Sequence, residues 1–253
     1  MKKKNKLMTI CVTTANRAKE LKKCLISLKK NDLAEVDIII GDNSQDDKSK
    51  GVVKKIFPKA KYFINKPRTD EVKNTNKCFS FSKTPYILLL HDDDMLSDNF
   101  IAEVINAVKK YPDADIIYTA RIMIDQNSVI LKKHITNIPS EYIHYKAEKI
   151  LDHYMLGNII TTYQVPLMTP GMIFKTQLYN KTGGLNSKID THYDTEFIYK
   201  ILALSKKLLL INKPIYLSTV WNGFSGRTKS SERGVVYFAQ KGVIDSFIEF
   251  CKK

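Results

Sequence analysis

The most constraining feature of this chain is the stretch 85–100, PYILLLHDDDMLSDNF, where an apolar run stops at three consecutive carboxylates. A short apolar run that ends at a turn signal is typical of a strand buried on both faces, as in a mostly parallel sheet. The acids therefore follow the carboxyl end of a predicted strand, which is where open α/β sheets bind ligands. Because an isolated buried carboxylate is costly, a cation must meet them, and a divalent metal ion is the simplest candidate. The acids are Asp92, Asp93 and Asp94.

The alternative interpretation of these acids is purely structural. An acidic turn can cap the helix that follows it, with Ser97 or Asp98 as the N-cap residue. The acids alone are compatible with both interpretations.

The residues before the acids predict a doubly wound parallel sheet. Apolar strand patterns alternate with amphipathic helix patterns over about ninety residues, which indicates β-α-β units. Strands are predicted at 7–12, 36–41 and 61–64, and helices at 18–30, 50–57 and 72–82. Neither a GxGxxG turn nor a GxxxxGK[ST] loop occurs, so the dinucleotide-binding fingerprint and the P-loop are both excluded.

The pattern is looser after the acids. Helices are predicted at 99–111, 147–156, 193–204 and 235–250, with a short one ending at 183–184. Strands are predicted at 116–125, 128–133, 172–174, 208–211 and 215–219, and residues 134–145 are expected to be irregular. The whole chain therefore predicts an α/β fold.

Length, charge and cysteine use narrow the class of protein. With 253 residues the chain can form one large α/β domain or two small ones. Its four cysteines show no zinc or disulfide spacing, which favours a reducing compartment. No stretch has the length of a signal peptide core or of a membrane span. The net charge of +15 indicates either a lysine-rich solvated surface or an anionic partner, and no nucleic-acid-binding motif accompanies it.

Several motifs in this order resemble the family 2 glycosyltransferases, whose fold is GT-A. The motifs are ICVTTANR, IIIGDNSQDD, NTNKCFSFSKTPYILLLHDDDML, PGMIFK, GGLN and YDTEF. The resemblance implies a single GT-A domain over 1–253, with a Rossmann-like, mostly parallel central sheet flanked by helices and a smaller acceptor-side sheet. It places the nucleotide-sugar donor half at 1–120 and the acceptor half, with the C-terminal loop and helix, at 121–253.

The resemblance also implies a nucleotide site at the ends of the first, second and fourth strands. Asp42 would accept the imide hydrogen bond of uracil in a UDP-type donor. Thr13 and Arg17 would line the same pocket, and Asp92 would contact the ribose.

The same resemblance implies that Asp93 and Asp94 hold Mn²⁺ or Mg²⁺ against the diphosphate. Oxygen ligands suit either ion, which would act as a Lewis acid on the departing diphosphate. Which two of the three acids form the DxD-type pair stays open, because His91 stands where many members carry the first Asp. Asp94 can instead support the other acids from behind or cap a helix.

Asp194 is the candidate catalytic base. An inverting transferase needs a carboxylate that takes the acceptor's proton from the side opposite the leaving diphosphate, so the base must come from a separate segment. Asp194 meets this condition, with Glu196 as the weaker alternative and His192 near enough to touch the acceptor. The structural alternative for Asp194 is an ordinary acid in the first turn of a helix.

Residues 222–229 resemble the family's C-terminal loop that closes over the donor, with Arg227 as the pyrophosphate contact. An unremarkable surface loop is the alternative. Trp221 is expected to pack in the core, with stacking on a sugar as the other possibility.

These observations predict an inverting, metal-dependent glycosyltransferase that moves a sugar from a nucleotide diphosphate, UDP above all, to a carbohydrate or glycolipid hydroxyl in cell-surface glycan synthesis. We expect a cytoplasmic protein, peripheral on the anionic inner face of the membrane through its N-terminal lysines. Two alternatives remain: a sugar nucleotidyltransferase, whose usual glycine-rich first loop is absent from TTANRAKE, and a non-enzymatic basic module for anionic polymers.

Overall fold

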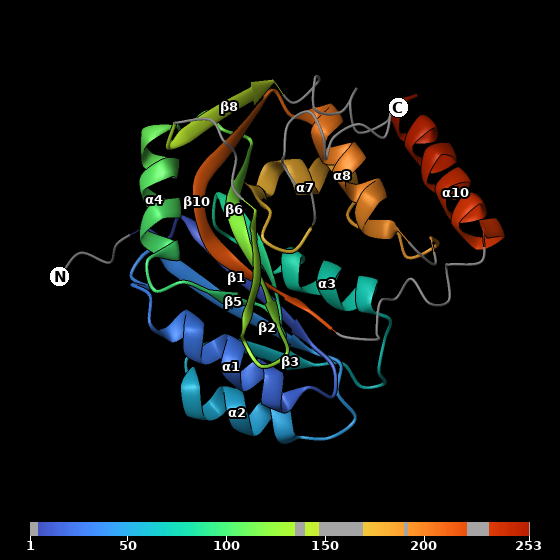
Figure 1. Cartoon of the computed structure of the whole chain (residues 1–253). Coiled ribbons are helices and arrows are strands. Elements are labelled where there is room, and N and C mark those ends of the chain that lie inside the picture. The colour runs from blue at the N-terminus through green and yellow to red at the C-terminus, as the bar shows by residue number, and fades with distance from the viewer. Residues whose placement is uncertain (1–4, 135–139, 147–168, 190–191, 222–232, 253) are drawn as a thin grey trace.

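A computed structural model describes residues 5–134, 140–146, 169–189, 192–221 and 233–252 (Figure 1). These residues form one ten-stranded sheet. Eight of its strands follow the order β3-β2-β1-β4-β9-β6-β10-β5, and the other two pair at the side of this path, β7 with β6 and β8 with β10. The strands are β1 (Met8–Thr14), β2 (Val36–Asp42), β3 (Lys61–Ile64), β4 (Tyr86–His91), β5 (Met95–Leu96), β6 (Ile116–Asp125), β7 (Ile130–His134), β8 (Tyr142–Lys146), β9 (Ile173–Lys175) and β10 (Lys207–Val220).

Helices cover both faces of this sheet, which gives three layers (Figure 1). The first group packs on one face and consists of α1 (Ala18–Lys29), α2 (Lys48–Ile56) and α4 (Phe100–Lys110). The second group packs on the other face and consists of α3 (Glu71–Ser80), α7 (Thr176–Thr182) and α8 (Tyr193–Leu204). The C-terminal helix α10 (Arg233–Cys251) packs against α8.

The buried strand β4 shows why the apolar run of the sequence is continuous. Its side chains alternate between the two faces, so Leu88 and Leu90 join the core beneath α1, whereas Ile87 and Leu89 join the core beneath α3. Helices bury both faces, and every position along the strand must therefore be apolar. The run ends at the carboxyl end of the strand, and the three acids follow directly after it.

Parallel pairing brings the carboxyl ends of three strands together. β1 lies between β2 and β4 and is parallel to both, with Thr13 opposite Gly41 on one side and His91 on the other. Gly41 is required by packing, since a Cβ there would lie 2.6 Å from the Cys78 sulfur of α3. The turns after β1, β2 and β4 are therefore neighbours in space.

The predicted α/β fold and most predicted elements are confirmed. Four details differ from the prediction. The separate, smaller acceptor-side sheet is wrong, because the described strands all belong to one ten-stranded sheet. Residues 142–145, expected to be irregular, form β8 together with Lys146 and pair with β10. The two strands predicted at 208–211 and 215–219 are one strand, β10, with register shifts on either side of Pro214. The two-residue strand β5 was not predicted, and the predicted helix 147–156 lies outside the described residues.

Candidate active site

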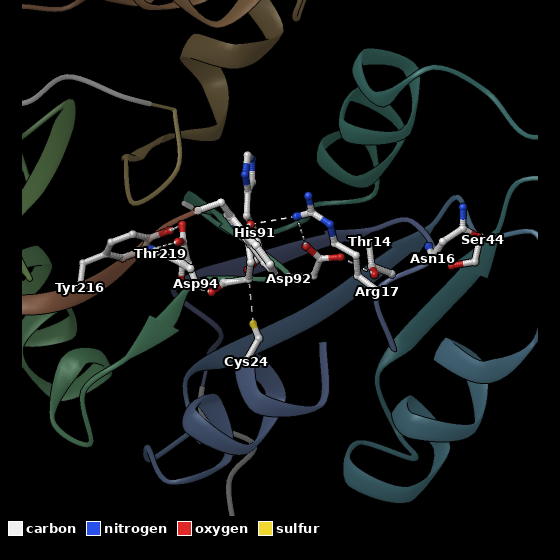
Figure 2. Close-up of polar contacts among 12 residues, drawn as sticks. Thr14, Asn16, Arg17, Cys24, Ser44, His91, Asp92, Asp94, Tyr216 and Thr219 are labelled. Atoms are coloured by element: carbon white, nitrogen blue, oxygen red, sulfur yellow. Dashed lines mark hydrogen bonds and ion pairs between the residues drawn. The ribbon is translucent and has the colours of Figure 1, made fainter. Parts of the chain in front are cut away.

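Asp92 follows β4 and is held by the turn after β1. The hydroxyl of Thr14 donates a 2.6 Å hydrogen bond to its Oδ2, and Arg17 Nη1 lies 3.5 Å from its Oδ1 (Figure 2). Burial raises the pKa of Asp92 to about 6, and the charge of Asp93 adds to this, against the Thr14 hydrogen bond and the Arg17 charge. This carboxylate is therefore poised to gain from a further positive charge.

Asp93 is the acid on which two segments of the chain converge. Its Oδ2 accepts a 2.8 Å hydrogen bond from Arg17 Nη1 and another of 2.8 Å from Trp221 Nε1. The Arg17 guanidinium also lies 5.4 Å from the centre of the Trp221 ring. Asp92 and Asp93 thus share one cationic nitrogen.

Asp94 is directed away from these two acids and toward β10. Its Oδ2 accepts a 2.6 Å hydrogen bond from the Tyr216 hydroxyl, and its Oδ1 accepts a 2.8 Å hydrogen bond from the Thr219 N–H (Figure 2). The side chain is buried, and this burial raises its pKa to about 6. Asp94 therefore links the acidic turn to β10, as in the interpretation that it supports the other acids from behind.

A cavity of about 460 Å³ opens at the ends of β1, β2 and β4. Of the predicted nucleotide-binding residues, Thr13, Arg17 and Asp92 line it, together with His91 and the metal candidate Asp93. The sequence interpretation missed the other lining residues, which are Thr14, Ala15, Asn43, Arg68, Glu71 and Asn74. Trp221 also lines the cavity, so its expected packing in the core is wrong, and stacking on a sugar stays a prediction.

The predicted uracil contact, Asp42, lies behind the wall of this cavity. It is fully buried, and its oxygens accept a 2.7 Å hydrogen bond from the Ser44 N–H and a 2.6 Å hydrogen bond from the Tyr62 hydroxyl. The neighbouring Asn43 lines the cavity instead and is bound to Thr69 through both ends of its amide. The role predicted for Asp42 stays a prediction.

A second cavity of about 240 Å³ adjoins the first and contains the candidate base. Asp194 lines it, in the first turn of α8, with its Oδ1 accepting a 2.8 Å hydrogen bond from the Thr195 N–H. Asp93, His91 and Glu71 line both cavities. The fold thus brings residues 93 and 194, which are 101 positions apart in the sequence, to one continuous site.

Of the remaining predicted residues, two do not line the second cavity and one lies outside the described residues. Glu196, the weaker base candidate, is fully buried and lies 2.5 Å from Lys200 Nζ and 2.6 Å from the hydroxyl of Ser246 on α10, which donates to it. It does not line the cavity. His192 precedes α8 in the left-handed conformation, with φ of 65°, and does not line it either. Arg227 lies outside the described residues.

The donor set at Asp93 fits a metal ion only in part. Among the described residues, no group of three or more His, Cys, Asp or Glu side chains could hold a metal ion. Magnesium-type sites commonly use one or two carboxylates and take their other ligands from water and a bound phosphate. Asp92 and Asp93 already share a cation, the guanidinium of Arg17. Asp92 and Asp93 can therefore supply the one or two carboxylate ligands that such a site takes from the protein.

Comparison with solved structures identifies the fold class. The S. aureus TarS 1–349 structure in complex with UDP-GlcNAc matches with a TM-score of 0.71 at 15% identity, covering 95% of this chain and 66% of that one. The complex of TarS 1–349 with UDP matches with a TM-score of 0.69 at 16% identity, covering 85% and 60%. Fold and site together define a protein of the GT-A class.

The sequence comparison identifies the family. The model of the family described as "Glycosyl transferase family 2" matches residues 9–176, more than half of the chain. The chain belongs to this family. "Uncharacterized protein MT1568" of Mycobacterium tuberculosis is 28% identical over 91 residues, which are 36% of this chain and 28% of that protein. The chain thus spans less than a third of this relative and about 60–66% of the TarS 1–349 structures. None of the helices in the described part of the chain is long and apolar enough to cross a membrane.

Proposed function

We propose that this protein transfers a sugar from a UDP-sugar to a hydroxyl group, with inversion at the anomeric carbon. One observation carries the proposal: Asp93 lies on the wall between a cavity lined by Thr13, Arg17 and Asp92 and a cavity lined by Asp194. A nucleotide diphosphate in the first cavity would present its sugar to the second. The candidate base then lies across the reacting carbon from the leaving group.

Two observations support UDP as the nucleotide. TarS, which shares the fold, has been solved with UDP and with UDP-GlcNAc. Asn43 lines the first cavity, and Asp42 next to it accepts a hydrogen bond from the Tyr62 hydroxyl, so amide and carboxylate oxygens that suit an imide donor such as that of uracil lie at this end of the site. Asp42 would be the acceptor of that imide hydrogen bond.

The metal site would be formed by Asp93, with Asp92 beside it, and by diphosphate oxygens. Bound Mn²⁺ or Mg²⁺ would act as a Lewis acid that neutralises charge on the departing diphosphate. Arg17 now bridges both acids, so metal binding would release its guanidinium to pair with phosphate oxygens. Asp94 would keep the acidic turn fixed to β10.

Asp194 would accept the proton of the attacking hydroxyl, and it is half-buried in the first turn of α8. The acceptor would be a carbohydrate or a lipid-linked glycan. The protein would act at the cytoplasmic face of the membrane, in synthesis of a cell-surface polysaccharide, attracted by its net charge of +15.

The test is release of UDP from UDP-GlcNAc with Mn²⁺, measured with and without glycolipid extract as acceptor source. We expect release that the extract stimulates and that Asp194→Asn reduces at least a hundredfold, the scale of general-base catalysis. The matched control is Asp245→Asn on α10, outside both cavities. Equal rates for Asp194→Asn and wild type would contradict the assignment of the base.

A further inference from the structure

The β6–β7 hairpin carries the most apolar exposed segment in the described part of the chain. Val129, Ile130 and Leu131 are consecutive, and their exposed fractions are 57%, 55% and 53%. The residues from 126 to 133 are all exposed, so the rest of the described chain leaves the three apolar side chains largely uncovered. Three adjacent large apolar side chains that remain more than half exposed indicate a surface that is covered by something else.

Positive charge adjoins this apolar tip. Lys132 and Lys133 follow directly and are exposed, and Lys23 of α1 donates a 3.1 Å hydrogen bond to the carbonyl of Gln126. The one acid of the turn, Asp125, is occupied locally, since its Oδ1 accepts 2.8 Å hydrogen bonds from the backbone N–H groups of residues 127 and 129. An apolar tip beside lysines has the composition of an anchor in an anionic lipid interface.

The hairpin also lies beside the candidate active site. Asp125 and Gln126 of its turn line one recess together with Asp93 and Trp221 (the turn lies near α1 in Figure 1). Any surface that binds the tip is therefore brought close to the acid that lies between the two cavities. A lipid-linked acceptor would then need no long reach to enter the site.

We propose that residues 129–133 insert into an anionic lipid bilayer and dock the protein on it. The apolar side chains enter the interface, and Lys132 and Lys133 pair with lipid phosphates. A second copy of the chain fits less well, because pairing this strand with itself brings two sets of lysines to one interface. Docking itself does not depend on catalysis; only its use in delivering the acceptor rests on the proposed glycosyl transfer.

The experiment is flotation of the full chain with vesicles of phosphatidylcholine alone or mixed equally with phosphatidylglycerol. We expect binding to the anionic vesicles, lowered about tenfold or more in Val129→Ser/Ile130→Ser/Leu131→Ser and about tenfold in Lys132→Gln/Lys133→Gln. The control changes three exposed apolar residues elsewhere, Ile26→Ser/Ile244→Ser/Ile248→Ser, whose exposed fractions are 44%, 43% and 44%. This control should float like wild type.

Equal flotation of the hairpin variants and wild type would overturn the proposal, as would loss of flotation in the control alone. A dimer in sedimentation velocity that the hairpin variant abolishes, without vesicle binding by wild type, would assign the tip to a second copy and also overturn it. Circular dichroism verifies that each variant is folded. UDP binding is measured in parallel, so a failure of the proposed function is seen separately from a failure of docking.

Discussion

The indole Nε1 of Trp221 donates a 2.8 Å hydrogen bond to Oδ2 of Asp93. This contact joins the residue after β10 to the acidic turn after β4, although 128 positions separate them in the sequence. Arg17 donates to the same oxygen, so Asp93 is occupied by two donors. A metal ion that binds Asp93 must compete with both, and this competition leads to the first prediction.

Arg17→Met should change nucleotide and metal binding in opposite directions. Loss of the guanidinium removes a diphosphate partner, and we expect UDP affinity to fall by about ten- to a hundredfold, the range of a charge-assisted hydrogen bond. The affinity of Mn²⁺ in the absence of UDP should rise, because Asp92 and Asp93 lose their internal cation. Calorimetric titrations of each ligand measure both effects. The control Lys19→Met, at an exposed position on α1, should alter neither affinity. If Arg17→Met lowers the affinities for UDP and for Mn²⁺ alike, Arg17 and the metal ion do not compete for the two acids.

Asp194→Asn and Glu196→Gln should separate catalysis from stability. We expect Asp194→Asn to lower kcat by about two orders of magnitude or more while UDP affinity and Tm stay near wild type. Glu196→Gln should instead destabilise the fold by about 2–4 kcal/mol, because Lys200 would keep a buried charge without its partner. Steady-state rates and thermal unfolding give the two readouts. The reverse pattern would make Glu196 the base.

Asp115→Asn should destabilise the sheet in a pH-dependent way. The Asp115 carboxylate accepts hydrogen bonds of 3.0 Å from Lys175 Nζ and 2.8 Å from the Lys206 N–H. Burial raises the pKa of Asp115, but these hydrogen bonds and the Lys175 charge outweigh it and leave the pKa below its ordinary value. Since the folded-state pKa is below the unfolded one, this group stabilises the fold above about pH 4 and its contribution is lost as the pH falls.

We therefore expect Asp115→Asn to cost about 1–2 kcal/mol at pH 7 in urea unfolding, with a difference from wild type that shrinks toward pH 3. Asp37→Asn is the control, because Lys6 Nζ lies as far as 3.9 Å from its carboxylate and its side chain is 48% exposed. A penalty for Asp115→Asn that does not vary with pH would contradict the charged interaction.

Local patterns predicted the first half of the fold well because parallel strands buried on both faces leave unambiguous apolar runs. The run at β4 and the acids after it are the clearest case. β8 was missed because Tyr142 to Lys146 alternates only weakly and is stabilised by pairing with β10, more than sixty positions later. Pairing between such distant segments cannot be predicted from the local sequence pattern.

The candidate site was predictable where a residue follows a strand end and less so where its direction depends on distant partners. Asp94 faces Tyr216 and Thr219, which lie 122 and 125 positions later, and nothing near Asp94 in the sequence indicates them. The sequence does predict that Asp194 and Glu196 point to different surroundings, because residues two apart on a helix face different sides. Arg68 and Glu71 were missed because the connection before α3 and the first turn of that helix carry no motif that local patterns detect.

The most direct test of the central claim is the binding of UDP with and without Mn²⁺, measured by calorimetry for wild type and Asp93→Asn. We expect Mn²⁺ to strengthen UDP binding at least tenfold in wild type, with this gain lost in Asp93→Asn and kept in Asp98→Asn, whose side chain is 71% exposed. GDP, CDP and dTDP should bind more weakly. If no nucleotide diphosphate binds in either condition while polyanions raise the Tm, the site does not bind a nucleotide-sugar donor and the account is wrong.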